Sequence, residues 1–149
     1  FVTLRRALAI AFGVADFLLV SFFGALWLTA ENRERDAVID LIRAQTGGDA
    51  AAMISMLDGC QQNPTCRADA RRDARALQRT GRIRILNIDS ATSHAILAAK
   101  GPTRVAWDVG GSSFPVVQCV QVERTGVPVL GGPVVLTHIG PPIKGDGSC

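Results

Sequence analysis

The chain has 149 residues, of which 48% are hydrophobic and 19% charged, and its formal net charge is +3. This length accommodates one domain of ordinary size and an accessory segment. The mild net charge does not by itself indicate a nucleic-acid partner. The sequence lacks the GxSxG, HExxH and glycine-rich phosphate-binding motifs, so we expect no enzyme activity, no catalytic residue and no cofactor.

The N-terminal part of the chain is a long apolar run. Residues 7–29, ALAIAFGVADFLLVSFFGALWLT, contain a single charged residue, Asp16. A helix of this length measures roughly 35 Å, enough to cross a hydrocarbon core of about 30 Å. A secretory signal usually has a shorter apolar region and an A-x-A cleavage site, whereas this run leads into a segment that continues at helical period, which predicts a retained anchor. Arg5 and Arg6 precede it and predict a cytoplasmic N-terminus. We therefore expect a transmembrane or filament-core segment, 1–30, and an extracytoplasmic α+β domain, 31–149.

The same helix is predicted to continue beyond the apolar run, because no proline or glycine interrupts residues 25–46. Apolar-face positions recur at helical spacing at Val38, Leu41, Ile42 and Gln45. Gly47 and Gly48 then end the helix. The prediction is one helix of about 40 residues, apolar in its first half and amphipathic in its second.

Two short helices are expected next. Asp49 is a candidate N-cap for DAAAMISMLDG, which carries an apolar stripe at Met53, Ile54 and Leu57. Thr65 is a candidate N-cap for a third helix, CRADARRDARALQRTG, which Gly81 would end. These glycines and caps predict helices much shorter than the first.

Arginines recur along the third helix at a spacing of four residues, at Arg67, Arg71, Arg75 and Arg79, with Arg72 alongside. Such a stripe is a candidate binding surface for a polyanion, whether DNA, a cell-wall polymer or anionic lipid headgroups. The alternative is an ordinary solvated helix face that Asp69 and Asp73 neutralise in part. No aromatic residue is interleaved, which counts against binding of a single strand.

The hydrophobic period then changes to two. Runs at 82–88, 93–109, 115–125 and 133–139 predict an antiparallel sheet of four strands, or of five if the second run divides at Gly101-Pro102. Val105, Trp107 and Val109 alternate with more polar residues, so one sheet face should be buried and the other wetter. The amphipathic half of the long helix is the expected cover for the buried face. The predicted fold class is α+β.

Four cysteines, Cys60, Cys66, Cys119 and Cys149, all follow the apolar run. Their position fits an oxidising compartment, and four cysteines allow three pairings. We favour Cys60 with Cys66 and Cys119 with Cys149. No C-x-x-C is present, and His94 and His138 are far apart, so we expect no metal site.

Asp16 places a carboxylate inside the apolar run. Such a group by default finds a partner inside a helix bundle, and in an assembly that partner would be Arg5, Arg6 or the N-terminal amine of a neighbouring copy. The alternative is a tolerated, protonated side chain without a role.

The layout of the whole chain resembles that of a type IV pilin. The features that match are Phe1, the apolar run 7–29, the amphipathic run 31–46, the strand runs 82–139 and the cysteines Cys119 and Cys149. The resemblance implies a chain processed to begin at Phe1, a membrane-anchored precursor and an extracellular filament whose core is built from copies of the apolar helix. Pilins usually carry a glutamate at the fifth mature position, where this chain has Arg5. The implied assembly residues are Phe1, Arg5, Arg6 and Asp16, and the implied partners are the chain itself and the membrane.

A second resemblance is to small membrane-anchored proteins with a cystatin-like or nuclear-transport-factor-like domain. The segment DLIRAQTGGDAAAMISML is similar to the helix, break and second helix of that group. This resemblance implies that the apolar run is only a tether, and that the domain binds a partner or small ligand between helix and sheet.

Overall fold

A computed structural model describes residues 2–92, 98–110, 114–127 and 132–149. The fold is α+β, as predicted: three helices are followed by a four-stranded antiparallel sheet. The elements are α1 (Val2–Gly47), α2 (Ala50–Met56), α3 (Pro64–Ala76), β1 (Ile83–Ser90), β2 (Ala99–Val109), β3 (Val116–Arg124) and β4 (Val134–Ile139).

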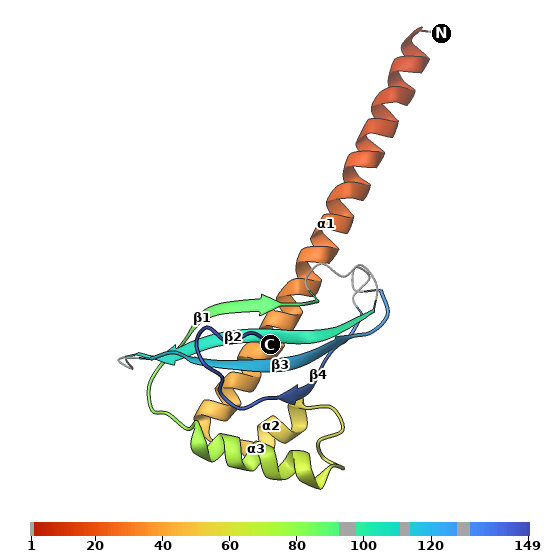
Figure 1. Cartoon of the computed structure of the whole chain (residues 1–149). Coiled ribbons are helices and arrows are strands. Elements are labelled where there is room, and N and C mark those ends of the chain that lie inside the picture. Colours follow the sequence, from red (N-terminus) through yellow and green to blue (C-terminus); the bar gives the residue numbers. More distant parts are fainter. Residues whose placement is uncertain (1, 93–97, 111–113, 128–131) are drawn as a thin grey trace.

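Helix α1 is one unbroken helix of 46 residues. Its N-terminal half projects away from the rest of the molecule, whereas its C-terminal half crosses one face of the sheet (Figure 1). The helix ends where Gly48 adopts a φ of 76°, a left-handed conformation that glycine enters without the steric penalty of a Cβ. The predicted apolar-then-amphipathic helix is confirmed.

The short helices differ in part from the prediction. Asp49 caps α2 as expected, and its carboxylate accepts the N–H of Ala52 at 2.9 Å. The cap of α3 is Asn63 rather than Thr65, because the Asn63 side-chain oxygen accepts the N–H groups of both Thr65 and Cys66. Proline follows the cap at the first helical position, where no N–H is needed.

Helix α3 also ends earlier than predicted, at Ala76 instead of Gly81. Beyond Leu77 the chain turns to the end of α1, where the Arg79 N–H donates to the carbonyl of Thr46 at 3.0 Å. A tertiary hydrogen bond thus replaces the bond that a longer helix would have made. Arg79 consequently lies outside the helix.

The sheet is a meander in the order β1-β2-β3-β4. Strand β2 runs without interruption through Gly101 and Pro102, which pair with Val122 and Gln121 of β3. The run 93–109 therefore yields one strand among the described residues, with 93–97 outside them.

The core lies between the inner sheet face and the amphipathic half of α1. Val38, Leu41 and Ile42 are fully buried there with Trp107 and other inner-face side chains, and α2 adds Met53. The predicted cover for the sheet is therefore correct. Gln45 occupies the same stripe and is also fully buried; neither polar atom of its amide has a hydrogen-bond partner among the described residues.

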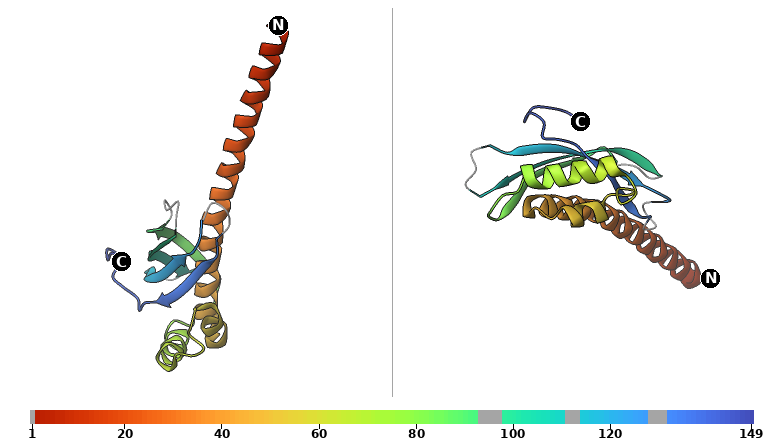
Figure 2. Two further views of the ribbon diagram at one scale, coloured as in Figure 1. Left: turned by 90° about the vertical axis from the view of Figure 1, so that its right-hand side faces the viewer. Right: turned by 90° about the horizontal axis from the view of Figure 1, so that it is seen from below.

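The outer sheet face is less exposed to solvent than predicted, because the C-terminal segment crosses it (Figure 2). Ile143 donates its N–H to the Val117 carbonyl at 2.7 Å, and Arg104 donates to the carbonyls of Gly145 and Gly147. Ala106 and Asp108, the residues that alternate with Val105, Trp107 and Val109, are only 8% and 7% exposed. The sheet is thus covered on both sides, by α1 and by the C-terminal segment.

Candidate functional site

The first notable surface is the apolar half of α1. Every residue from 5 to 25 is exposed, and Phe12, Phe17 and Val20 have exposed fractions of 68%, 70% and 73%. This helix is long and apolar enough to span a membrane. An apolar surface of this size requires a cover other than the chain's own domain.

The sequence-predicted assembly residues do not meet within one chain. Phe1 lies outside the described residues, while Arg5, Arg6 and Asp16 are exposed on α1. Eleven residues separate Arg5 from Asp16, a distance of about 16 Å along a helix. No ion pair of Asp16 is found in the described part of the chain.

The second notable feature is a buried ion pair between α1 and the end of β3. Glu34 and Arg124 are each only 2% exposed. The Arg124 Nε donates to Glu34 Oε2 at 2.8 Å, and its Nη2 donates to the same oxygen. Two threonine hydroxyls also engage the carboxylate: Thr92 donates to Oε2 at 2.8 Å and Thr103 donates to Oε1 at 2.6 Å. We call these four residues the Glu34 cluster.

The cluster keeps Glu34 ionised. Burial raises the pKa of this carboxyl, but hydrogen bonds from Ser90, Thr103, Thr92 and Arg124 together outweigh burial and hold the pKa below its ordinary value. A carboxylate that is charged near neutral pH and engaged by four donors is poorly suited to act as a general acid or base. Its geometry instead joins α1 to the sheet where the helix leaves the domain.

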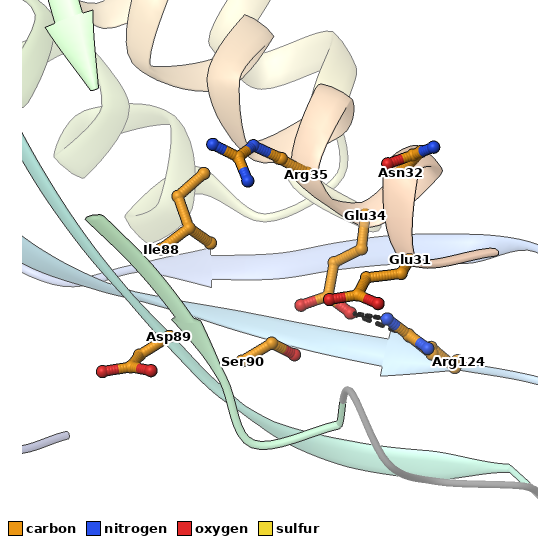
Figure 3. Close-up of a pocket in the computed structure, with 8 residues that line it drawn as sticks. All are labelled: Glu31, Asn32, Glu34, Arg35, Ile88, Asp89, Ser90 and Arg124. Atoms are coloured by element: carbon orange, nitrogen blue, oxygen red, sulfur yellow. Dashed lines mark hydrogen bonds and ion pairs between the residues drawn. The ribbon is translucent and has the colours of Figure 1, made fainter. Parts of the chain in front are cut away.

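A cavity of about 330 Å³ opens beside the Glu34 cluster. Figure 3 shows Glu31, Asn32 and Arg35 of α1 on one side and Asp89 and Ser90 of β1 on the other. Its remaining lining residues are Glu34, Ile88 and Arg124. The cavity thus lies between helix and sheet, and charged and polar side chains dominate its lining.

The Glu34 cluster was missed in the sequence, although a signal for it exists. Glu34 lies four residues before Val38, in register with the buried stripe of α1. Arg124 follows Val120 and Val122 at the period of a strand, so it belongs to the same inner face. An acid and a base that both occupy core positions predict a buried pair.

The predicted arginines gather around α3 at the end of the domain away from the N-terminus (Figure 1). Arg71, Arg72 and Arg75 are exposed on the helix and Arg67 is half-buried, whereas Arg79 follows the helix. Arg72 forms ion pairs with Asp69 at 3.0 Å and with Asp73 at 3.2 Å. The carboxylates therefore neutralise Arg72, not the whole stripe.

Both favoured cysteine pairs are present as disulfides. Cys60 is bonded to Cys66 beside the start of α3, and Cys119 of β3 is bonded to Cys149. Disulfides of this kind persist in oxidising, extracytoplasmic environments.

The fold and these surfaces define a class: an α+β protein with disulfides, in which a single N-terminal helix could span a membrane. Comparison with protein-family models, with curated proteins and with solved structures found no match.

Proposed function

We propose that the chain is a structural subunit of a pilus-like extracellular filament, held together by its apolar helices. The observation that carries this proposal is the continuity of α1. One rigid helix exposes large apolar side chains over its first half and is buried against the sheet over its second. A filament of packed helices covers the first half, while the globular half remains outside.

The side chains of the apolar half are suited to close helix packing. Small residues recur on alternate positions at Ala7, Ala9, Ala11, Gly13 and Ala15. A Cβ added at Gly13 would meet no atom within 4 Å, so the helix surface there is open to a neighbour. Small residues let helix backbones approach closely in an apolar environment, where van der Waals contact is a main driving force.

The Glu34 cluster supports the same proposal, because it fixes the helix to the domain near the point where α1 emerges. Among the α1 residues whose burial the structure describes, Glu34 is the first that is buried. Since the ion pair and both threonine contacts lie at this point of α1, the exposed half of the helix is held in a fixed orientation relative to the domain. The packing of such fixed helices in a filament core would also determine how the globular domains are arranged around that core.

The test compares Asp16→Ala with a matched change, Asp36→Ala, which removes an exposed carboxylate from the amphipathic half of α1. Cells producing each variant are sheared, and the released material is imaged and probed for the chain. We expect filaments from wild type and from Asp36→Ala, and at least a tenfold loss for Asp16→Ala. A sheared fraction without filaments from the wild type would refute the proposal. Unchanged filaments from Asp16→Ala would remove Asp16 from assembly.

The cavity beside the Glu34 cluster favours a second candidate function, in which α1 is only a tether and the domain binds a small polar ligand. A cavity of about 330 Å³ lies at the lower end of the size of small-molecule sites. On this alternative, the chain stays in the membrane fraction as a monomer, and Asp89→Ala in the cavity wall alters ligand binding without affecting filaments.

A further inference from the structure

We propose that the arginine face of α3 binds the phosphate backbone of double-stranded DNA without reading its sequence. The arginine face comprises Arg67, Arg71 and Arg75 of α3, with Arg79 and Arg82 on the segment that follows. This binding activity is separate from the filament function and does not depend on it.

The arginine face is uncompensated and rigidly supported. Ala70 and Ala74 of α3, with Leu77 just after it, are buried in the core and hold the helix against the domain. In the described part of the chain, none of the five arginines forms an ion pair with a carboxylate. Arg75 and Arg79 instead donate to backbone carbonyls of the same segment. Three positive charges therefore lie on α3, and two more follow on the segment that leads to β1.

Support comes from both ends of this element. The Cys60–Cys66 disulfide and the Asn63 cap fix the start of α3. At its end, the Arg79 N–H and the Gln78 amide donate to carbonyls at the C-terminus of α1. A fixed row of cations loses less conformational freedom on binding than a flexible one.

The position of α3 excludes anionic lipids of the chain's own membrane as the ligand. The apolar run ends at Thr29, and the segment directly after α3 is hydrogen-bonded to Thr46. Seventeen helical residues separate these points by about 25 Å, roughly three Debye lengths at physiological salt. The arginine face therefore meets polyanions on the far side of the domain.

Phosphodiester polymers suit this surface better than carboxylate polymers do. Every cation of the face is arginine, whose planar fork can donate two hydrogen bonds to one phosphate. Duplex DNA presents one charge per about 1.7 Å of axis, so several phosphates fall within reach of α3. The chain offers no interleaved aromatic residue for stacking of bases, which favours a duplex over a single strand.

The test measures fluorescence anisotropy of a labelled duplex with the full chain in nanodiscs of zwitterionic phosphatidylcholine. Neutralisation of about four phosphates predicts that affinity falls about 100-fold between 50 and 200 mM salt. The double change Arg71→Gln/Arg75→Gln removes two contacts, so the same increase in salt should lower the affinity only about tenfold. Arg71→Lys/Arg75→Lys keeps both charges and should retain most of the salt dependence.

The matched control is Lys100→Gln/Lys144→Gln, which removes two positive charges from exposed positions outside α3. This control should bind DNA with the salt dependence of the wild type. Equal effects of control and arginine variants would show that only net charge matters and would overturn the assignment. So would absence of binding at 50 mM salt, or tighter binding of heparin than of unlabelled duplex, which would indicate a polysaccharide ligand.

Discussion

Replacement of Arg124 by methionine tests the Glu34 cluster most sharply. The change keeps an unbranched side chain but leaves the Glu34 carboxylate, 2% exposed, with hydroxyl donors alone. Removal of one partner from a buried ion pair costs about 3–5 kcal/mol, because the remaining charge is uncompensated. A loss of this size should lower the melting temperature by at least about 10 °C for a domain of this length.

The assay is guanidinium denaturation of the full chain in non-ionic detergent at neutral pH. Trp107 is 1% exposed and should report unfolding through its fluorescence. A Trp27→Phe background makes it the only tryptophan, because the chain contains two. The matched control is Arg43→Met, whose ion pair with Asp40 is solvent-exposed on α1 and is expected to contribute less than about 1 kcal/mol.

The double variant Glu34→Gln/Arg124→Met completes the cycle. It buries no charge, and the glutamine carbonyl oxygen still accepts hydrogen bonds, so it should be more stable than Arg124→Met by about 2 kcal/mol. A loss below about 1 kcal/mol for Arg124→Met, or a double variant as unstable as the sum of both single changes, would refute the reasoning.

Three further predictions concern stability. Because the pKa of Glu34 is depressed in the folded state, the stability that its charge contributes is present above the ordinary carboxyl pKa. This stability is lost as the pH falls through the pKa of the folded state. The Glu34→Gln variant should therefore lose less stability than the wild type between about pH 5 and pH 3, measured by denaturation at each pH. Gln45→Leu should stabilise the fold by about 1–2 kcal/mol, because it replaces a buried amide that has no hydrogen-bond partner among the described residues. A lower denaturation midpoint than that of the wild type would contradict this expectation. Cys119→Ser/Cys149→Ser opens a loop with a sequence separation of 30 and should cost about 3.5 kcal/mol by chain entropy, with mass spectrometry of unreduced peptides as the check on pairing.

The sequence predicted the large elements well because their signals are local and repeated. A helix period of 3.6 places Val38, Leu41 and Ile42 on one face, and a strand period of two places Val105 and Trp107 on another. Both faces bury the same kind of surface, so their association follows from the hydrophobic effect alone.

The ends of the helices and the buried polar contacts could not be predicted from hydrophobic periodicity, because they depend on competing caps and on tertiary hydrogen bonds. Thr65 and Asn63 are both acceptable caps, but only Asn63 directly precedes a proline that suits the first helical position. The end of α3 depends on Thr46, a residue more than thirty positions earlier in the chain. The Glu34–Arg124 contact spans 90 positions and requires the register of the whole sheet.

Cysteine cross-linking tests most directly the central claim, that copies of the apolar half of α1 cover one another. Single cysteines at Phe17, Leu18, Leu19 and Val20 sample every side of the helix, because successive residues differ by about 100°. Each variant is oxidised on the cell surface, sheared, and analysed without reduction. We predict covalent dimers in the sheared filament fraction from at least one position, and none from a control cysteine at the exposed Arg43. Recovery of all four variants as monomers in the membrane fraction alone would contradict the claim.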